Sequence, residues 1–310
     1  MKSRRKSLPF LIGGAALLAL DIGRRIYRET QIFSPDRAPV RTWDPVDYGI
    51  PAGAVDEHWI DTPDGEKLHA WYCRAEKPQA SALFCHGNTG NLTISADVMP
   101  HLLNAGLNVL LFDYRGFGKS SGRPSYRGVI ADGVTAAKFH DSIRPQLPSI
   151  LYGFSLGGAV AAQVLRRHPF DALILQSTFT SLPEITRVLY PRLPMHLLAG
   201  RLFDTLSVIR KLEVPLLVLH GSADEVAPCW MAHQIHDACP TPKRIHTVEG
   251  GLHKDIFERD ADSLVSAVSQ FIAEVPRREH PIVVEDPPAI ERWSASALRA
   301  LRRAIRKVPA

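Results

Sequence analysis

Residues 149–162 read "SILYGFSLGGAVAA": a short apolar run leads directly into a serine, and a segment of small residues follows it. The run is typical of a strand buried on both faces, and the segment after it has the pattern of a helix. Ser155 lies at the junction, with Gly153 and Gly157 two positions away on either side. In this G-x-S-x-G context the serine is held on a strained turn, with its hydroxyl exposed beyond the sheet at the positive end of a helix dipole. The stretch predicts a strand–turn–helix unit of an α/β fold, with Ser155 as a candidate nucleophile.

The sequence on either side alternates short apolar runs with longer segments of helical length. Two early runs alternate in polarity around the turn "TPDG" and predict an antiparallel hairpin, whereas the later runs are apolar throughout, as in parallel strands. The expected strands are 54–61, 66–73, 81–85, 107–113, 149–154, 172–177, 214–220 and 243–249. The expected helices are 93–105, 128–144, 156–168, 229–239 and 256–274. The predicted fold class is α/β, with a mostly parallel central sheet, helices on both faces and a short cap over about residues 178–213.

Partners for the serine follow two later strands. A serine hydroxyl becomes a nucleophile only when a base accepts its proton and an acid orients that base. Asp224 lies in the loop "HGSADEVAP" and His253 lies in "GGLHKD", each directly after an expected strand. Ser155, Asp224 and His253 are therefore predicted to form a catalytic triad at one edge of the sheet. Structural interpretations stay open: Asp224 as a loop cap, with Glu225 as its substitute, and His253 as a surface histidine.

A candidate oxyanion hole follows another expected strand, in "HGNTGN" at residues 86–91. The backbone N–H groups of Asn88 and of Leu156, the residue after the serine, are predicted to converge on one substrate oxygen. The mechanism needs no metal and no organic cofactor. His233 and His236 have helical spacing but no evident third ligand, so no metal site is predicted.

Three other residues near these loops are interpreted as structural. His86 precedes the candidate oxyanion hole and is expected to hold that loop. Asp113 and Arg115, in "FDYRGFG", are expected to brace their own loop by charged hydrogen bonds rather than to act on substrate.

Together these motifs resemble the α/β-hydrolase superfamily and, more narrowly, its Bem46-like serine-hydrolase branch. The resemblance covers about residues 30–275, which are predicted to form the catalytic domain. It implies that Ser155, Asp224 and His253 act as nucleophile, acid and base. It also implies a hydrophobic segment near the N-terminus. The resemblance does not extend to residues 277–310. The motifs that carry it are "HGNTGN" (86–91), "FDYRGFGKSSG" (112–122), "YGFSLGG" (152–158), "HGSADEVAP" (220–228) and "GGLHKD" (250–255).

Charge is distributed unevenly along the 310 residues, whose formal net charge is +5. Residues 1–28 carry +6 and residues 277–310 carry +4, so residues 29–276 carry −5. The acidic middle argues against nucleic-acid binding, and the basic ends favour contact with an acidic membrane surface. The four cysteines lack the spacing of a disulfide framework or a zinc site, so they are interpreted mostly as core thiols. A Cys229–Cys239 disulfide stays an alternative only in an oxidising compartment. The four cysteines are Cys73, Cys85, Cys229 and Cys239.

Both ends predict membrane association. Residues 1–29 place four basic residues before an apolar run from Leu8 to Leu20, without a clear cleavage site, which favours a single uncleaved anchor. The run is shorter than the about 20 residues that span a bilayer, so a cleaved signal and a surface-lying helix stay open. Residues 276–310 form a proline-rich linker and a basic amphipathic helix, which suits a membrane interface or docking on the domain or on a second copy. The side of the membrane and the oligomeric state are not predicted.

The predicted function is a serine hydrolase that cleaves carboxylic esters or thioesters through an acyl-enzyme, without a cofactor. The segment from Thr178 to Glu213 is rich in apolar residues broken by prolines, which would line an acyl pocket or simply pack on the sheet. With the membrane-directed ends, it favours a lipid-like small-molecule acyl substrate. A serine peptidase on the same fold and a non-catalytic membrane-tethered binding protein remain alternatives, and neither the acyl chain nor the leaving group is predicted.

Overall fold

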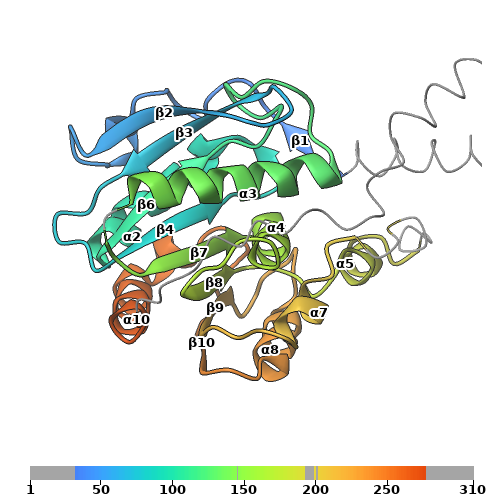
Figure 1. Cartoon of the computed structure of the whole chain (residues 1–310). Helices are drawn as coiled ribbons and strands as arrows, with labels where there is room; N and C mark the ends of the chain where they lie inside the picture. Colours follow the sequence, from blue (N-terminus) through green and yellow to red (C-terminus); the bar gives the residue numbers. More distant parts are fainter. Residues whose placement is uncertain (1–31, 145, 193–198, 200–201, 277–310) are drawn as a thin grey trace, which may run out of the picture. The chain divides into compact units, whose positions relative to one another are not determined.

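Eight strands form one central sheet in the computed structural model, which describes residues 32–144, 146–192, 199 and 202–276 (Figure 1). Their order across the sheet is β10-β9-β8-β7-β4-β6-β3-β2. The mostly parallel sheet confirms the predicted fold class. The strands are β2 (Val55–Asp61), β3 (Lys67–Cys73), β4 (Ala80–Cys85), β6 (Leu107–Phe112), β7 (Ser149–Phe154), β8 (Ala172–Gln176), β9 (Leu216–Gly221) and β10 (Lys243–Val248).

The antiparallel part of the sheet is the predicted hairpin. β2 and β3 pair in register from Val55 opposite Cys73 to Asp61 opposite Lys67, and β3 also runs antiparallel to β6. All other neighbours in this sheet are parallel. β2 is the edge strand and keeps polar side chains in solvent, whereas β3 is buried along nearly its whole length. The alternation in the sequence of β2 thus reflects its one-sided burial.

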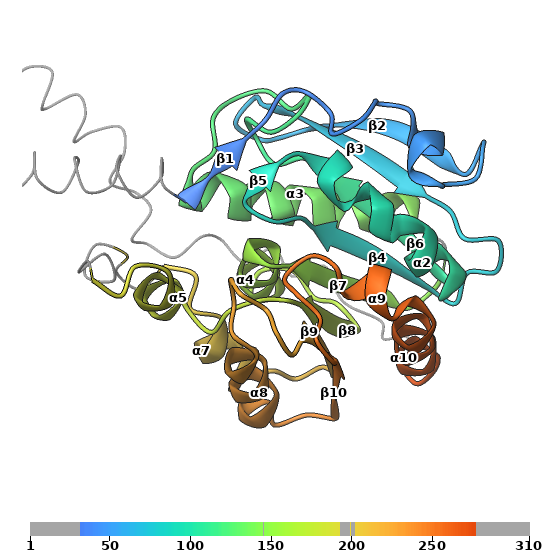
Figure 2. The same cartoon turned by 180° about the vertical axis from the view of Figure 1, so that it is seen from behind.

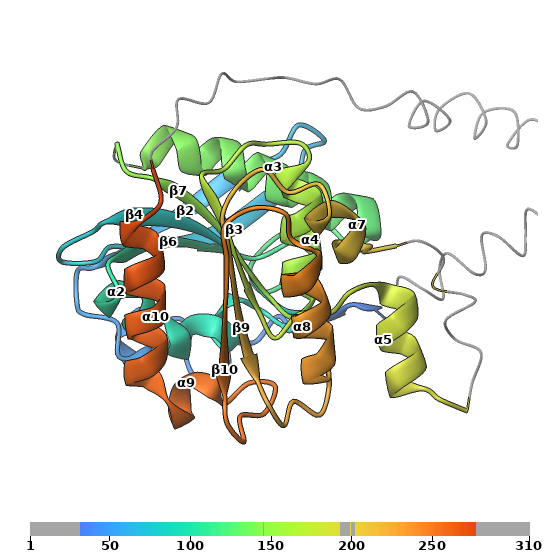
Figure 3. The ribbon, with the colours of Figure 1, turned by 90° about the horizontal axis from the view of Figure 1, so that it is seen from below.

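Helices cover both faces of the sheet and enclose two apolar clusters. In β4, Leu83 and Cys85 belong to one cluster, whereas Ala82 and Phe84 belong to the other, because successive strand residues point to opposite faces. Figure 3 shows α4 and α8 on one side of β9 and α10 on the other. The helices of the first face are α3 (Tyr126–Ile143), α4 (Leu156–Leu165), α7 (Thr205–Ile209) and α8 (Cys229–Ala238), and those of the second are α2 (Met99–Asn104), α9 (Ile256–Arg259) and α10 (Ala261–Ala273).

Two predicted helices are interrupted. The segment expected as one helix over 93–105 begins as the 3₁₀ helix η2 (Leu92–Val98) and continues as α2. Pro100 lies in the first turn of α2, where its missing N–H is tolerated, but it does not fit inside a continuous α-helix. The segment expected over 256–274 is divided between α9 and α10, because Asp260 has non-helical φ and ψ angles of −147° and 58°.

The first described residues pair with the predicted oxyanion loop. β1 (Ser34–Pro35) runs parallel to β5 (Thr89–Gly90) in a separate two-stranded sheet, and the N–H of Ser34 donates to the carbonyl of Asn88 at 2.9 Å (Figure 2). A 3₁₀ helix, η1 (Pro45–Tyr48), follows before the hairpin. The chain that enters the domain therefore lies directly against the loop after β4.

The predicted N-terminal anchor (1–29) and the C-terminal helix lie outside the described residues, so both remain predictions. Within the described part of the chain, no helix is both long enough and apolar enough to cross a bilayer.

Candidate active site

The turn between β7 and α4 carries Ser155. The φ and ψ angles of this residue are 53° and −120°, a left-handed conformation that residues other than glycine rarely adopt. The flanking glycines permit the turn, because a Cβ at Gly153 would overlap the backbone of Gly158, and one at Gly157 would overlap the carbonyl of Cys85. The predicted strand–turn–helix unit is therefore present, with the serine at the N-terminus of α4 and at the carboxyl end of a central strand.

We expect Ser155→Gly to fold more stably than Ser155→Ala, because both lose the hydroxyl but only glycine adopts this backbone without strain. A non-glycine residue in such a region costs about 1–3 kcal/mol, and the extra freedom of glycine in the unfolded chain costs about 0.5–1 kcal/mol. The expected net gain is about 1 kcal/mol in the free energy of unfolding, measured by urea denaturation. Equal stability of the two variants would show that the strain in the turn is no larger than the entropic cost of glycine, about 0.5–1 kcal/mol.

The structure brings Ser155, His253 and Asp224 into one line. The Nε2 atom of His253 lies 3.0 Å from the Oγ atom of Ser155, and its Nδ1 atom lies 2.9 Å and 3.1 Å from the two carboxylate oxygens of Asp224. All three residues are buried, with exposed fractions of 8%, 5% and 6% for the serine, the histidine and the aspartate. His253 is therefore placed to donate from Nδ1 to the carboxylate and to accept the serine hydrogen at Nε2.

Asp224 is held by groups that sequence reasoning missed. Its Oδ1 atom accepts the backbone N–H groups of Val226 and Ala227 at 2.9 Å and 2.8 Å, and its Oδ2 atom lies 3.2 Å from Nε2 of His220. The Nε2 atom of His220 also lies 2.7 Å from the carbonyl of Ala227, so two acceptors face it and it carries the hydrogen. Burial raises the pKa of Asp224, but hydrogen bonds with His220 and His253 outweigh that effect and lower it below its ordinary value. The carboxylate is thus ionised and orients His253.

Two further residues fix the imidazole of His253. Glu225, considered above as a substitute acid, accepts the backbone N–H of His253 at 3.2 Å and does not contact the ring. The ring of Phe154 packs 5.4 Å from the imidazole, between centroids. Both come from positions adjacent to predicted site residues, which is the one signal in the sequence that could have indicated them. The geometry therefore selects Asp224 as the acid and leaves Glu225 to hold the backbone of the histidine.

The predicted oxyanion loop lies beside the serine. A Cβ atom added to Gly87 would be 3.7 Å from the Cβ of Ser155. The next residue, Asn88, is fixed by its carbonyl, which accepts from Ser34, and by its side chain, which donates to the carbonyl of Ile32 at 3.2 Å. Leu156 is the first residue of α4, where backbone N–H groups have no partner within the helix. The roles of Asn88 and Leu156 as oxyanion donors remain predictions.

The predicted cap segment is partly buried in the domain core. α5 (Leu182–Leu189) buries Leu182 in the domain core, and Phe203 is fully buried against the rings of Phe33 and Tyr126. Leu189 and Tyr190, at the end of α5, are 45% and 46% exposed. Part of the apolar segment therefore packs on the domain, as the alternative interpretation held, and the end of α5 stays open to solvent.

The other candidates have structural surroundings. Arg115 donates to Asp132 and Asp64, which confirms the expected bracing of its loop. Over the described ranges, no group of three or more histidine, cysteine, aspartate or glutamate side chains is placed to hold a metal ion. Cys229 and Cys239 are free thiols.

The chain is similar in sequence and in fold to several known proteins. Residues 76–208 match the family described as "Serine aminopeptidase, S33". An uncharacterized protein of Mycobacterium tuberculosis, Rv2307c, is 32% identical over 277 residues, which are 87% of this chain and 96% of that protein. The uncharacterized membrane protein YNL320W of Saccharomyces cerevisiae is 29% identical over 81% of this chain and 92% of its own. Among solved structures, the Pyrococcus furiosus esterase Pf2001 superimposes with a TM-score of 0.62 and 21% identity, covering 78% of this chain and 97% of the esterase. At this identity, the likeness to the esterase shows a shared fold.

Proposed function

The chain belongs to the α/β-hydrolase superfamily, and from that membership we propose that it is a serine hydrolase that cleaves carboxylic esters or thioesters of lipid-like acyl groups. The observation that carries the proposal is the unbroken line from Ser155 Oγ through His253 to Asp224, with separations of 3.0 Å and 2.9 Å. A fold alone hosts many activities, so the function rests on this line of side chains.

In the proposed mechanism, Ser155 attacks the acyl carbonyl while Nε2 of His253 takes its proton. Asp224 holds the Nδ1–H tautomer of His253 and stabilises the imidazolium that forms. The N–H groups of Leu156 and Asn88 stabilise the oxyanion, aided by the N-terminus of α4. His253 then protonates the leaving alcohol or thiol, and water hydrolyses the acyl-enzyme by the same steps in reverse.

A lipid-like substrate is supported by two features. Leu189 and Tyr190 are exposed at the end of α5 and leave apolar surface in the predicted cap segment, which we propose receives the acyl chain. The yeast relative is described as a membrane protein, in line with the anchor predicted for residues 1–29. We propose membrane association for this chain on that basis.

A second candidate is an aminopeptidase, because the matched family carries that name. The triad does not discriminate between ester and amide substrates, since both form an acyl-enzyme. An aminopeptidase also needs a group that binds the free α-amine of its substrate. A substrate comparison therefore separates the two candidates.

We expect kcat/KM for p-nitrophenyl esters to rise from acetate to octanoate and beyond. Each methylene that reaches an apolar wall contributes about 0.8 kcal/mol, which is about a three- to fourfold gain. Leu189→Gln should flatten this rise and leave acetate unchanged, whereas Val46→Gln, at a residue 51% exposed on η1, serves as the matched control. The aminopeptidase proposal would replace the esterase proposal under two joint results. The protein would hydrolyse leucine p-nitroanilide only when its α-amine is free, and kcat/KM would not rise along the ester series.

A further inference from the structure

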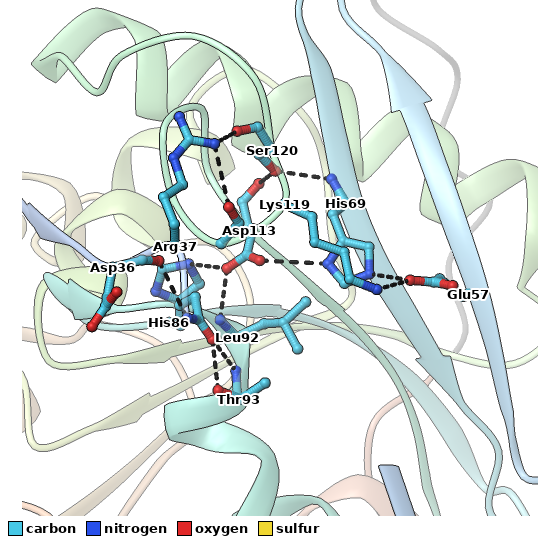
Figure 4. Close-up of polar contacts among 12 residues, drawn as sticks. Asp36, Arg37, Glu57, His69, His86, Leu92, Thr93, Asp113, Lys119 and Ser120 are labelled. Carbon is cyan, nitrogen blue, oxygen red and sulfur yellow. Dashed lines mark hydrogen bonds and ion pairs between the residues drawn. The ribbon is translucent and has the colours of Figure 1, made fainter. Parts of the chain in front are cut away.

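A buried histidine outside the triad lies between two carboxylates. His69, on β3, has an exposed fraction of 0%. Its Nε2 atom is 2.7 Å from Oε1 of Glu57, and its Nδ1 atom is 3.5 Å from Oδ2 of Asp113 (Figure 4). A carboxylate oxygen only accepts hydrogens, and an imidazole that offers a hydrogen from both nitrogens carries a positive charge. The contact at Nε2 is a hydrogen bond, whereas the contact at Nδ1 is not one but lies within ion-pair distance, and the two together suit an imidazolium.

Aromatic rings surround the same imidazole. The ring centroids of Trp43, Trp59 and Trp71 lie 5.4 Å, 5.2 Å and 6.3 Å from that of His69. Three of the five tryptophans of the chain thus border one histidine. The π-systems of aromatic rings attract cations within about 6 Å, and indole does so most strongly. Trp43 and Trp59 lie within that range, so the surroundings of His69 favour a positive charge on it.

The carboxylate of Asp113 connects His69 to the oxyanion loop. Asp113 is fully buried, and its Oδ1 atom accepts the backbone N–H of Leu92 at 2.6 Å and lies 3.6 Å from Nε2 of His86. The Nδ1 atom of His86 lies 2.8 Å from the carbonyl of Gly87, directly before Asn88. The Nε2 atom of His86 makes no hydrogen bond with the residues that the structure describes, so Asp113 connects His69 to the predicted oxyanion loop through the backbone N–H of Leu92, four residues after Asn88.

His69 is also the cation that the buried carboxylate of Asp113 requires. A buried charge is unfavourable unless an opposite charge lies beside it. Burial lowers the pKa of His86, against the opposing effects of Asp113 and Gly87, so His86 is the neutral imidazole of the pair. Two other cations lie near the cluster: Lys119 donates to Glu57 and lies over the ring of Trp43, and Arg37 donates to the carbonyls of Gly118 and Ser120.

We propose that His69 is a positioning residue: as a buried imidazolium it holds Asp113, and through Asp113 it holds the loop from His86 to Asn88 in the conformation that the reaction needs. The expected effect of His69 on the reaction rate rests on the proposed hydrolase function. The charge of His69 can be tested separately, by tryptophan fluorescence. A protonated imidazole quenches the fluorescence of an indole beside it.

The experiment compares His69→Gln and Glu57→Gln with wild type in the full chain. Asp61→Asn is the matched control, because Asp61 is another exposed carboxylate of β2, paired at 3.7 Å with Lys67. Glu57→Gln changes a half-exposed side chain and tests the inference even if His69→Gln does not fold. Each variant is assayed with p-nitrophenyl butyrate, and its tryptophan emission is recorded at neutral pH.

For His69→Gln we expect kcat to fall by about 10- to 100-fold with KM within about twofold, because a displaced oxyanion loop weakens transition-state binding alone. Glu57→Gln should lower kcat by about three- to tenfold, and Asp61→Asn should leave it unchanged. At neutral pH, His69→Gln should emit more strongly than wild type, because the variant lacks the imidazolium that quenches the tryptophans.

Two results would overturn the inference. One is wild-type kcat in folded His69→Gln or Glu57→Gln. The other is a wild-type emission that matches His69→Gln at neutral pH, which would make His69 neutral. If wild type hydrolyses no ester and no fluorophosphonate probe labels it, the hydrolase proposal fails, while the emission still decides whether His69 is charged.

Discussion

Ser155→Ala should abolish ester hydrolysis and labelling by a fluorophosphonate probe while leaving the fold intact. Removing a triad nucleophile lowers kcat by about 10⁴- to 10⁶-fold, because the covalent route is lost and only binding and the oxyanion hole remain. The fold should survive, because the hydroxyl of Ser155 hydrogen-bonds only with His253 among the described residues, and alanine keeps the Cβ that the turn already accommodates in serine. The measurement is the initial rate with p-nitrophenyl butyrate together with in-gel fluorescence of the probe.

Ser177→Ala is the matched control. Ser177 follows β8, has a positive φ of 48°, is fully buried, and its hydroxyl has no hydrogen-bond partner within the described structure. Its replacement should leave labelling and turnover within about twofold of wild type, since it lies outside the line of the triad. Persistent labelling of Ser155→Ala would mean that another residue is the nucleophile. A wild type that neither labels nor turns over an ester would favour the binding-protein alternative.

Much of the sheet could be predicted because each central strand is covered on both faces. Such strands read as uninterrupted apolar runs, and β4, β6, β7 and β9 are buried at every position. Helix ends were less accessible to this reasoning. The helix breaks at Asp260, and a 3₁₀ helix precedes Pro100. Both are local changes in backbone conformation, which the spacing of hydrophobic residues does not predict.

The meeting of the triad residues could be predicted for a topological reason. Loops after parallel strands share one edge of the sheet, so Ser155 after β7, Asp224 after β9 and His253 after β10 have to converge. The residues that support them were not accessible in this way. His220 lies inside a buried strand and reads as part of an apolar run, and His69 meets Asp113 only because β3 pairs with β6.

The apolar residues of the cap show a second limit. Leu182, Phe203 and Leu189 look alike in the sequence, yet the first two are buried in the domain core and the third is 45% exposed. Phe203 packs inward against the rings of Phe33 and Tyr126, which come from distant parts of the chain. Hydrophobicity alone therefore does not separate a pocket wall from a core contact.

Asp224→Asn should lower kcat by about 10⁴-fold without unfolding the protein. The two backbone N–H groups of Val226 and Ala227 require an acceptor at Oδ1, so the amide oxygen takes that position. The amide NH₂ group then occupies the place of Oδ2, 2.9 Å from Nδ1 of His253. It donates to Nδ1 and forces the hydrogen of the imidazole onto Nε2, where it faces Ser155 and blocks proton transfer.

Glu225→Gln is the control for this tautomer argument. Glu225 is the neighbouring carboxylate and contacts the backbone of His253 rather than its ring, so its amide variant retains an acceptor for that N–H. Its kcat should stay within about tenfold of wild type, because a weakened backbone contact shifts the ring without changing its tautomer. Steady-state rates with p-nitrophenyl butyrate, with urea denaturation to confirm folding, measure both variants. If Asp224→Asn keeps more than about a tenth of the wild-type kcat, Asp224 does not set the tautomer of His253, and the proposed triad loses its acid.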